Sequence, residues 1–422
     1  MTRNANGRWL LVILNLCFLL QVADAMTGEL RFFEARSDIK VLKNAALVLL
    51  TAVCAMAVWK NRGGSGNRGK LDSEFRSVRK LVAILALCSL YLGMKNGGNL
   101  LITSAALLKF ILPVLAAYLV ARSLEEREIL SSLRVFLYAG FLVYLFCKVF
   151  PVLSVNRQAL FSIDWLHSQS PFESDMFSPM AISFLLYFCY NRKSRADLAV
   201  AVLFNLLAFK RLAVLFTPVL LAAGMPRFAD LRVKGRWIWV LRAAVLGLVA
   251  FYYSLCMGAF QDLLTGLAGQ SVDGFTMGRS WRMRLLREAG YSLRGLGTLG
   301  ISSIRNNVFS TGGYSITGME MDMIQILMEC SWVGLAAVVW LLSNLARRSF
   351  YGFCAVVFLF GQMITSHWYD ITYFWLVFYF LLASQRPRKG GSVREAYEAY
   401  GRRVRFVWGQ KRAAYLRRGS GI

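Results

Sequence analysis

Long apolar runs recur along most of the chain, and they limit what it can fold into more than any other feature. Of the 422 residues, 57% are hydrophobic and only 17% are charged, and the mean hydropathy is +0.49. A soluble globular chain carries more charge than this. In lipid every backbone polar group must be satisfied internally, and continuous rather than alternating apolar runs favour helices over a barrel. The sequence therefore predicts an all-α, polytopic membrane protein.

Twelve apolar segments are candidates for membrane-spanning helices. They are residues 9–25, 44–59, 81–94, 100–121, 135–153, 177–190, 197–209, 212–225, 237–257, 321–343, 350–366 and 368–384. Lys210 and Arg211 divide one long apolar stretch, so the segments on either side of them are counted separately. The first segment also has the basic start, apolar middle and small-residue end of a secretory signal peptide, but we favour an uncleaved first helix.

The distribution of lysine and arginine predicts how these segments are threaded. If the twelve segments cross in order, the parts of the chain richest in these residues fall on one side, namely 60–80, 192–195, 226–236 and 385–422. Because cytoplasmic loops carry an excess of lysine and arginine, both termini are expected in the cytoplasm. The chain then divides into nine spans (1–257), a large outer loop (258–320), three spans (321–384) and a basic tail (385–422).

The outer loop has a biased set of basic residues. It contains no lysine but six arginines, which are Arg279, Arg282, Arg284, Arg287, Arg294 and Arg305. A solvated loop face is one interpretation, since the bias against positive charge outside weakens in long loops. However, the planar guanidinium of arginine binds phosphate through two hydrogen bonds at once, which lysine cannot do. We therefore favour a site for a phosphate or an acidic glycan.

The remaining polar residues indicate few other functions. The eight cysteines fall in eight different segments without a C-x-x-C pair, which is typical of buried apolar residues. His167 and His367 are far apart in the sequence, so we interpret them as isolated polar residues rather than a metal pair. No nucleotide-binding motif is present, and neither a cofactor nor a metal is expected. The formal charge of +26 lies largely in the cytoplasmic loops and tail, which favours membrane lipids over nucleic acid as partners.

Three stretches, in order, resemble motifs of the O-antigen polymerase and ligase (Wzy-type) family of bacterial inner-membrane proteins. FNLLAFKRLAVLFTPVLLA is similar to a membrane segment that the family interrupts with a short polar turn, here Lys210 and Arg211. TMGRSWRMRLL resembles the Gly-Arg element that opens the large outer loop, here at Arg279. GMEMDMIQILMECSWVGLAAVVWLL resembles the helix after that loop, with Glu329 and Gly334 at the family's glutamate and glycine.

The resemblance covers roughly residues 155–345 and departs from the family's pattern at one place. The ligases commonly have a His-Asn pair nine residues before the glutamate, where this chain has Glu320 and Met321. The resemblance therefore implies a polymerase rather than a ligase. A further similarity is Arg157 followed by the stretch PFESDMFSPMA.

The resemblance also implies an activity. The chain would be a GT-C-like helical enzyme that joins polyprenyl-pyrophosphate-linked oligosaccharides at the periplasmic face, without a nucleotide or a metal. Negative charge accumulates on the departing pyrophosphate, so fixed guanidinium groups stabilise the transition state. The candidates for this role are Arg279, Arg282, Arg211 and Arg157; Lys210 and the other loop arginines are candidates for substrate binding. A chain-length regulator or another polysaccharide-assembly protein is a candidate partner.

Few carboxylates on the outer side are available as a general base. Glu320 and Asp322 stand just before an apolar segment, as do Glu173 and Asp175. Residues two apart on a helix point to different sides, so neither pair need act as a unit. Stabilisation of a helix N-terminus is an alternative role for both pairs. Glu320 or Asp322 is the candidate base.

Two ionisable residues are predicted inside apolar segments, where such groups are functional candidates by default. They are Glu329 and Lys109, which could pair with each other.

Two other classes of protein stay open. A polyprenyl-phosphate-sugar-dependent glycosyltransferase would also face outward and need a divalent metal, but it commonly has an acidic pair in its first outer loop. Here that loop has only the scattered Glu29, Glu34 and Asp38. A lipid-linked glycan flippase or transporter is the alternative without catalysis, although the sequence shows no inverted repeat and no matching pair of Gly/Pro-broken segments.

Overall fold

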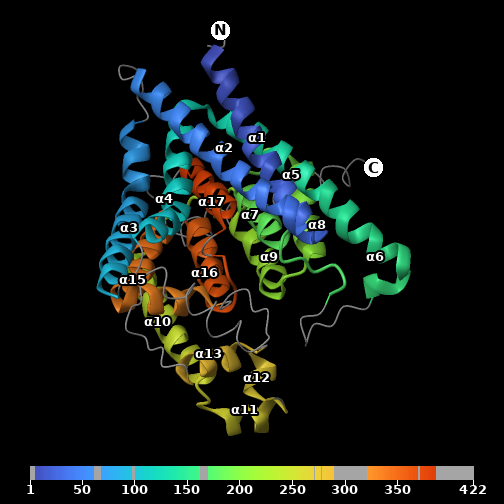
Figure 1. Cartoon of the computed structure of the whole chain (residues 1–422), viewed down its shortest axis with the longest axis vertical. Helices are drawn as coiled ribbons and strands as arrows, with labels where there is room; N and C mark the ends of the chain where they lie inside the picture. The colour runs from blue at the N-terminus through green and yellow to red at the C-terminus, as the bar shows by residue number, and fades with distance from the viewer. Residues whose placement is uncertain are drawn as a thin grey trace, which may run out of the picture.

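The computed structural model describes residues 5–60, 68–96, 100–161, 170–269, 271–276, 278–288, 321–368 and 371–385. Every regular element in this part of the chain is helical (Figure 1). The first helices are α1 (Ala5–Glu29), α2 (Phe33–Lys60), α3 (Arg68–Lys95), α4 (Leu100–Ser123), α5 (Glu126–Tyr144), the π-helical turn η1 (Leu145–Val149), α6 (Phe150–Val155), the 3-10 turn η2 (Arg157–Phe161) and α7 (Ser178–Tyr190). They are followed by α8 (Arg195–Ala208), α9 (Arg211–Ala223), α10 (Gly235–Cys256), α11 (Gln261–Ala268), α12 (Val272–Phe275), α13 (Arg279–Glu288), α15 (Asp322–Ala346), α16 (Phe350–Thr365) and α17 (Thr372–Ser384). Each apolar segment predicted from the sequence is helical apart from a few residues at its ends, so the all-α prediction is confirmed for the described residues.

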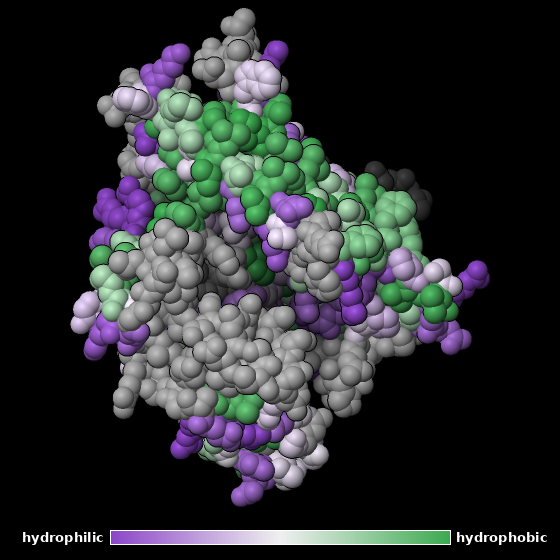
Figure 2. All heavy atoms as spheres, in the orientation of Figure 1, coloured by the Kyte–Doolittle hydropathy of each residue, from purple (hydrophilic) through white to green (hydrophobic). Residues whose placement is uncertain are grey.

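Six helical segments are long and apolar enough to cross a membrane. They are Arg8–Glu29, Ser37–Lys60, Phe75–Lys95, Glu126–Val155, Gly235–Cys256 and Asp322–Ala346. Several of them expose large apolar side chains, for example Trp9, Leu49 and Leu87. Figure 2 shows the resulting apolar surface over α1 and α2. A soluble surface rarely carries so much exposed apolar area. These properties fit a helical membrane protein whose peripheral helices face lipid.

Shorter apolar helices form the buried centre of the bundle. Helices α7, α16 and α17 have 13 to 16 residues, which corresponds to about 20–24 Å against a hydrocarbon core of about 30 Å. All side chains at 178–189 in α7 and at 373–382 in α17 are buried. Because these helices are surrounded by protein rather than lipid, polar groups can be accommodated at their ends.

Local sequence explains where several helices begin and end. Ser194 and Ser349 cap α8 and α16, and each hydroxyl accepts the N–H of the residue three positions later, at 3.3 and 2.9 Å. Helix α8 ends at Phe209, whose φ of 41° bends the chain before α9 begins. At the other end of α9, a Cβ on Gly224 would overlap the carbonyl group of Cys189. Helices α7 and α9 therefore approach closely because this residue is a glycine.

Helix α15 is broken at Ser331, where φ is 59° and ψ is −172°. Side chains other than glycine rarely adopt this backbone conformation, which costs about 1–3 kcal/mol. The break brings the backbone so close to Cys330 that a Cβ on Gly334 would overlap the Cys330 side chain. The part of α15 before the break, residues 322–330, is completely buried. No glycine or proline marks the break in the sequence.

One end of the bundle brings together loops that are distant in the sequence, and we call it the loop end. It consists of residues 170–177, the bend between α8 and α9, residues 366–368 after α16, the start of α15, and α13. Tyr373 at the start of α17 donates a hydrogen bond to the carbonyl of Met176 at 3.3 Å. The N–H of Asp322 donates to the carbonyl of Ser366 at 3.2 Å. Figure 1 shows α11, α12 and α13 at this end, opposite the N-terminus of α1.

Candidate functional site at the loop end

Helix α13 lies across the ends of α10 and α15. Its buried Met283 and Leu286 pack into a small apolar cluster with Cys256 of α10 and with Met321 and Ile324 at the start of α15. The apolar positions of α13 are three residues apart and therefore share one face of the helix. This packing fixes α13, and with it the loop arginines on its other faces, beside the first turn of α15.

The arginines of α13 differ in what they contact. Nη1 of Arg279 donates a hydrogen bond to the carbonyl of Thr276 at 3.1 Å. Arg284 forms an ion pair with Asp273, and the same carboxylate accepts a hydrogen bond from Ser280. Burial alone would raise the pKa of Asp273, but the Ser280 and Arg284 hydrogen bonds and the Arg284 charge outweigh it and lower this pKa below its ordinary value. The positive charge of Arg284 is therefore compensated by the carboxylate of Asp273 in the same loop.

The remaining predicted loop residues divide into two groups. Arg282 is half-buried, like Arg279, and Arg287 is exposed at the end of α13. Arg294, Arg305 and Glu320 lie outside the described residues. Arg279, Arg282 and Arg284 are therefore the half-buried arginines of α13, and Arg284 is paired with Asp273.

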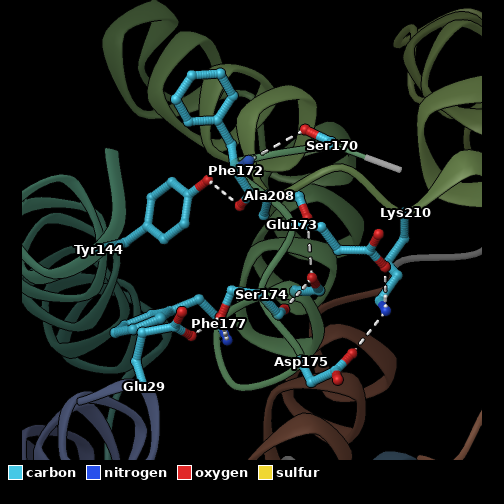
Figure 3. A network of polar contacts seen from close by, with 11 residues as sticks. Glu29, Tyr144, Ser170, Phe172, Glu173, Ser174, Asp175, Phe177, Ala208 and Lys210 are labelled. Carbon is cyan, nitrogen blue, oxygen red and sulfur yellow. Dashed lines mark hydrogen bonds and ion pairs between the residues drawn. The ribbon is translucent and has the colours of Figure 1, made fainter. Parts of the chain in front are cut away.

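Lys210 lies between α8 and α9 and binds two carboxylates (Figure 3). Its Nζ donates to Oε1 of Glu173 at 2.6 Å and to Oδ1 of Asp175 at 2.8 Å. Burial alone would lower the pKa of Lys210, but the charges of Asp175 and Glu173 and their hydrogen bonds raise it above its ordinary value. Residues 173 and 175 precede α7 and are not helical, so both carboxylates reach the same lysine.

A second ion pair adjoins the first through Ser174 (Figure 3). Nζ of Lys148 lies 2.9 Å from Oε1 of Glu29, and Ser174 donates to Oε2 of the same carboxylate at 2.5 Å. Tyr144 donates to the carbonyl of Phe172 at 2.8 Å and holds the start of this segment. Across these three ion pairs, three carboxylates and two ammonium groups give a net charge of −1. This network orders residues 170–177 and is not itself an anion site.

The other basic candidates lie on different elements. Arg211 is the first residue of α9 and is half-buried, whereas Arg157 begins η2 and is exposed. Leu212 packs against Gly361 of α16, which places the start of α9 beside the last turns of α16. Lys109 is part of α4, but its side chain lies outside the described part of the structure.

Asp322 and His367 form a buried acid–histidine pair at the loop end. Asp322 has 0% exposure, and its Oδ1 lies 2.9 Å from Nδ1 of His367. Its Oδ2 accepts the N–H of Trp368 at 2.6 Å. An ionised carboxylate only accepts hydrogen bonds, so with Asp322 ionised Nδ1 of His367 carries the proton and Nε2 is the basic nitrogen of the ring. The His367 side chain is 28% exposed and therefore reaches the surface of the loop end.

Sequence reasoning found Asp322 but missed its partner. The two residues are 45 positions apart, and the interpretation of His367 as an isolated polar residue is wrong. They meet because α15 and α16 pack together, so that residues 366–368 after α16 return to the N-terminus of α15. That position also suits a carboxylate electrostatically, since the helix dipole stabilises negative charge there. No signal in the sequence indicates this pairing.

Glu329 lies inside α15, as its apolar surroundings in the sequence predict. It is 3% exposed, and its Oε1 accepts a hydrogen bond from Nε2 of Gln325 at 3.0 Å. The two residues are one helical turn apart, and the break at Ser331 follows directly. The predicted pairing of Glu329 with Lys109 stays a prediction.

The cysteines are mostly buried, as predicted. All eight are free thiols; six of them are buried, and Cys88 and Cys147 are half-buried. Among the described residues, no group of three or more His, Cys, Asp or Glu side chains is placed to hold a metal ion. His167 lies outside the described residues.

No protein-family model, curated protein or solved structure matches the chain. The resemblance to the polymerase and ligase family therefore stays a prediction, and the function has to be inferred from the residues at the loop end.

Proposed function

We propose that this protein is a polysaccharide polymerase that joins polyprenyl-pyrophosphate-linked oligosaccharide units. The observation that carries the proposal is the Asp322–His367 pair, which lies beside the arginine-bearing helix α13. A histidine oriented by a buried carboxylate is suited to take a proton from a hydroxyl group. Guanidinium groups beside it are suited to stabilise a phosphate leaving group. Glycosyl transfer from a lipid pyrophosphate needs both.

The reaction would be a direct displacement at the anomeric carbon. Nε2 of His367 takes the proton of the acceptor hydroxyl as its oxygen forms a bond to the anomeric carbon of the donor sugar. The bond between that carbon and the pyrophosphate oxygen breaks, and the electron pair leaves with polyprenyl pyrophosphate. Attack from the opposite side predicts inversion at this carbon. The donor is already activated, so the step needs neither a nucleotide nor a metal.

The arginines receive different roles in this proposal. Arg279 and Arg282 on α13 and Arg211 on α9 would stabilise the negative charge of the departing pyrophosphate. Lys210 would position the site by ordering residues 170–177 through Glu173 and Asp175.

The proposal includes an orientation in a bacterial inner membrane. With twelve crossings and both termini in the cytoplasm, the loop end would face the periplasm, where lipid-linked units are polymerised. The six long apolar helices, and the lysines and arginines of the described loops 192–195 and 226–236 at the opposite end, support this orientation.

The test is polymerisation by the purified protein in nanodiscs, with a synthetic polyprenyl-pyrophosphate oligosaccharide, no nucleotide and EDTA. We expect a ladder of products on a gel, which Arg279→Ala and His367→Ala each abolish. Arg232→Ala, an exposed arginine at the opposite end of the bundle, is the matched control and should leave the ladder intact. Transfer that requires Mg²⁺ or Mn²⁺ would instead indicate the phosphate-sugar-dependent glycosyltransferase.

One observation favours a lipid-linked glycan flippase as the second candidate. Helix α15 is broken next to the buried Glu329, and broken helices with a buried charge are common at transport sites. In cells, loss of a flippase leaves lipid-linked units on the cytoplasmic side, whereas loss of a polymerase leaves them on the outer side. Surface labelling of the accumulated units in cells that carry Arg279→Ala distinguishes the two.

A further inference from the structure

Arg242 is a buried arginine in α10, at the end of the bundle opposite the loop end. It is 7% exposed. It lies seven residues after Gly235, where α10 begins, which corresponds to about 10 Å along the helix axis. A guanidinium at this depth in a membrane-crossing helix is costly unless its charge is compensated.

Every contact of Arg242 in the described part of the chain is with a neutral group. Its Nε donates to Oγ of Ser343 at 2.8 Å, and its Nη2 donates to Oδ1 of Asn344 at 2.8 Å and to the carbonyl of Trp340 at 3.5 Å. Its Cζ lies 3.6 Å from the ring centroid of Trp340 and 4.9 Å from that of Trp239. These contacts hold α10 against α15 and orient the guanidinium, but none supplies a negative charge.

The surrounding charges are also positive. No ion pair joins Arg242 to a carboxylate among the described residues. Arg347, a second cation, acts on it electrostatically. The segments that border this end, 226–236 and 347–349, contain six basic residues but only one acidic residue, Asp230. Asp230 accepts a hydrogen bond from Tyr190 at 2.7 Å. The buried guanidinium of Arg242 therefore lies near two segments, 226–236 and 347–349, that are themselves mostly basic.

We propose that the phosphate of an anionic glycerophospholipid binds at Arg242, between α10 and α15, and supplies the missing negative charge. A lipid fits better than a soluble anion because the side chains around Arg242 are apolar and exposed to the bilayer. Trp239 and Trp340, whose rings lie beside the guanidinium, are 59% and 46% exposed. Tryptophan is typical of the membrane interface, and basic sites between helices bind anionic headgroups. The site is independent of the proposed polymerase activity.

Native mass spectrometry of the delipidated protein in detergent tests this site. The probes are phosphatidylglycerol, which is anionic, and phosphatidylcholine, which is zwitterionic, with the same acyl chains. We expect the wild type to bind one phosphatidylglycerol about tenfold or more tightly than phosphatidylcholine, as one charge-assisted hydrogen bond implies. Arg242→Gln should remove this preference. Arg236→Gln changes an exposed arginine at the same end and should keep it.

Three outcomes would overturn the proposal. One is equal binding of the two lipids by the wild type, which is decisive even if Arg242→Gln does not fold. The second is an Arg242→Gln variant with an unchanged preference. The third is stabilisation of the wild type by glycerol 3-phosphate to the same extent as by phosphatidylglycerol, since the site would then select a free phosphate rather than a lipid. Arg242→Lys keeps the charge without the planar stacking and should retain part of the preference.

Discussion

Replacing Asp322 with asparagine is the most direct test of the proposed base. The substitution keeps the size of the side chain but turns one hydrogen-bond acceptor into a donor. In the native protein, the two carboxylate oxygens face the N–H of Trp368 at 2.6 Å and Nδ1 of His367 at 2.9 Å. After Asp322→Asn, the amide nitrogen must face one of these two groups.

The expected magnitudes follow from this geometry. If the amide nitrogen faces the N–H of Trp368, one buried donor is left unsatisfied, which costs about 1–3 kcal/mol of stability. The His367 ring then keeps its proton on Nδ1, but no carboxylate charge remains to stabilise its protonated form, so the base is weakened in this case as well. If the amide nitrogen faces His367, the ring must present an unprotonated Nδ1 and carry its proton on Nε2. The ring then cannot accept the proton of the acceptor hydroxyl, and a general base contributes about 10²- to 10⁴-fold to a rate. We therefore expect a loss of at least about 100-fold in rate from a protein that still folds.

Two measurements in nanodiscs separate these effects: the initial rate of polymer formation and the thermal unfolding midpoint. His367→Gln should lower the rate to a similar extent with a smaller loss of stability, because the His367 side chain is partly exposed. The double variant should be little slower than either single one, because both changes disable one base. An Asp322→Asn variant that is destabilised but polymerises at the wild-type rate would refute the assignment of His367 as the base.

Three further predictions concern the fold. Gly224→Ala should destabilise the protein by about 1–3 kcal/mol, because its Cβ overlaps the carbonyl of Cys189; chemical unfolding in detergent measures this, and an unchanged midpoint would contradict the close approach of α7 and α9. Ser331→Gly should stabilise the protein by about 1 kcal/mol or more, since glycine adopts the backbone conformation at the break without strain; a lower unfolding midpoint would argue against that conformation. The contact of α13 with Asp273 should weaken on acidification, because the pKa of this carboxyl is lowered in the folded protein. Its stabilising effect is complete above the ordinary pKa of about 4 and is lost as the pH falls through the lower folded value. Hydrogen exchange in α13 should increase over that range in the wild type, and Asp273→Asn should abolish this pH dependence.

The fold class and the positions of the helices follow from the amino-acid sequence alone. In lipid the backbone N–H and C=O groups must be hydrogen-bonded internally, and continuous apolar runs in a chain with so little charge favour helices for this. The twelve predicted segments accordingly coincide with helices. Glu329 was a candidate because ionisable residues inside apolar segments are rare, and Asp322 because few carboxylates lie on the predicted outer side. Lys210 was a candidate through the family resemblance. The scattered cysteines were predicted correctly for a similar reason, since isolated cysteines in apolar segments behave as small apolar residues.

Which of these groups meet depends on how the helices pack. His367 lies 45 residues from Asp322, and Lys210 lies 37 residues from Glu173, so neither pairing has a local pattern that a sequence could reveal. The break at Ser331 has no glycine or proline to mark it. The conformation of Ser331 is held by packing around α15. Packing of α10 against α15 also determines that Arg242 donates its hydrogen bonds to neutral groups of α15. Helix formation depends on neighbouring residues along the chain, whereas the partner of a buried charge depends on which helices lie side by side.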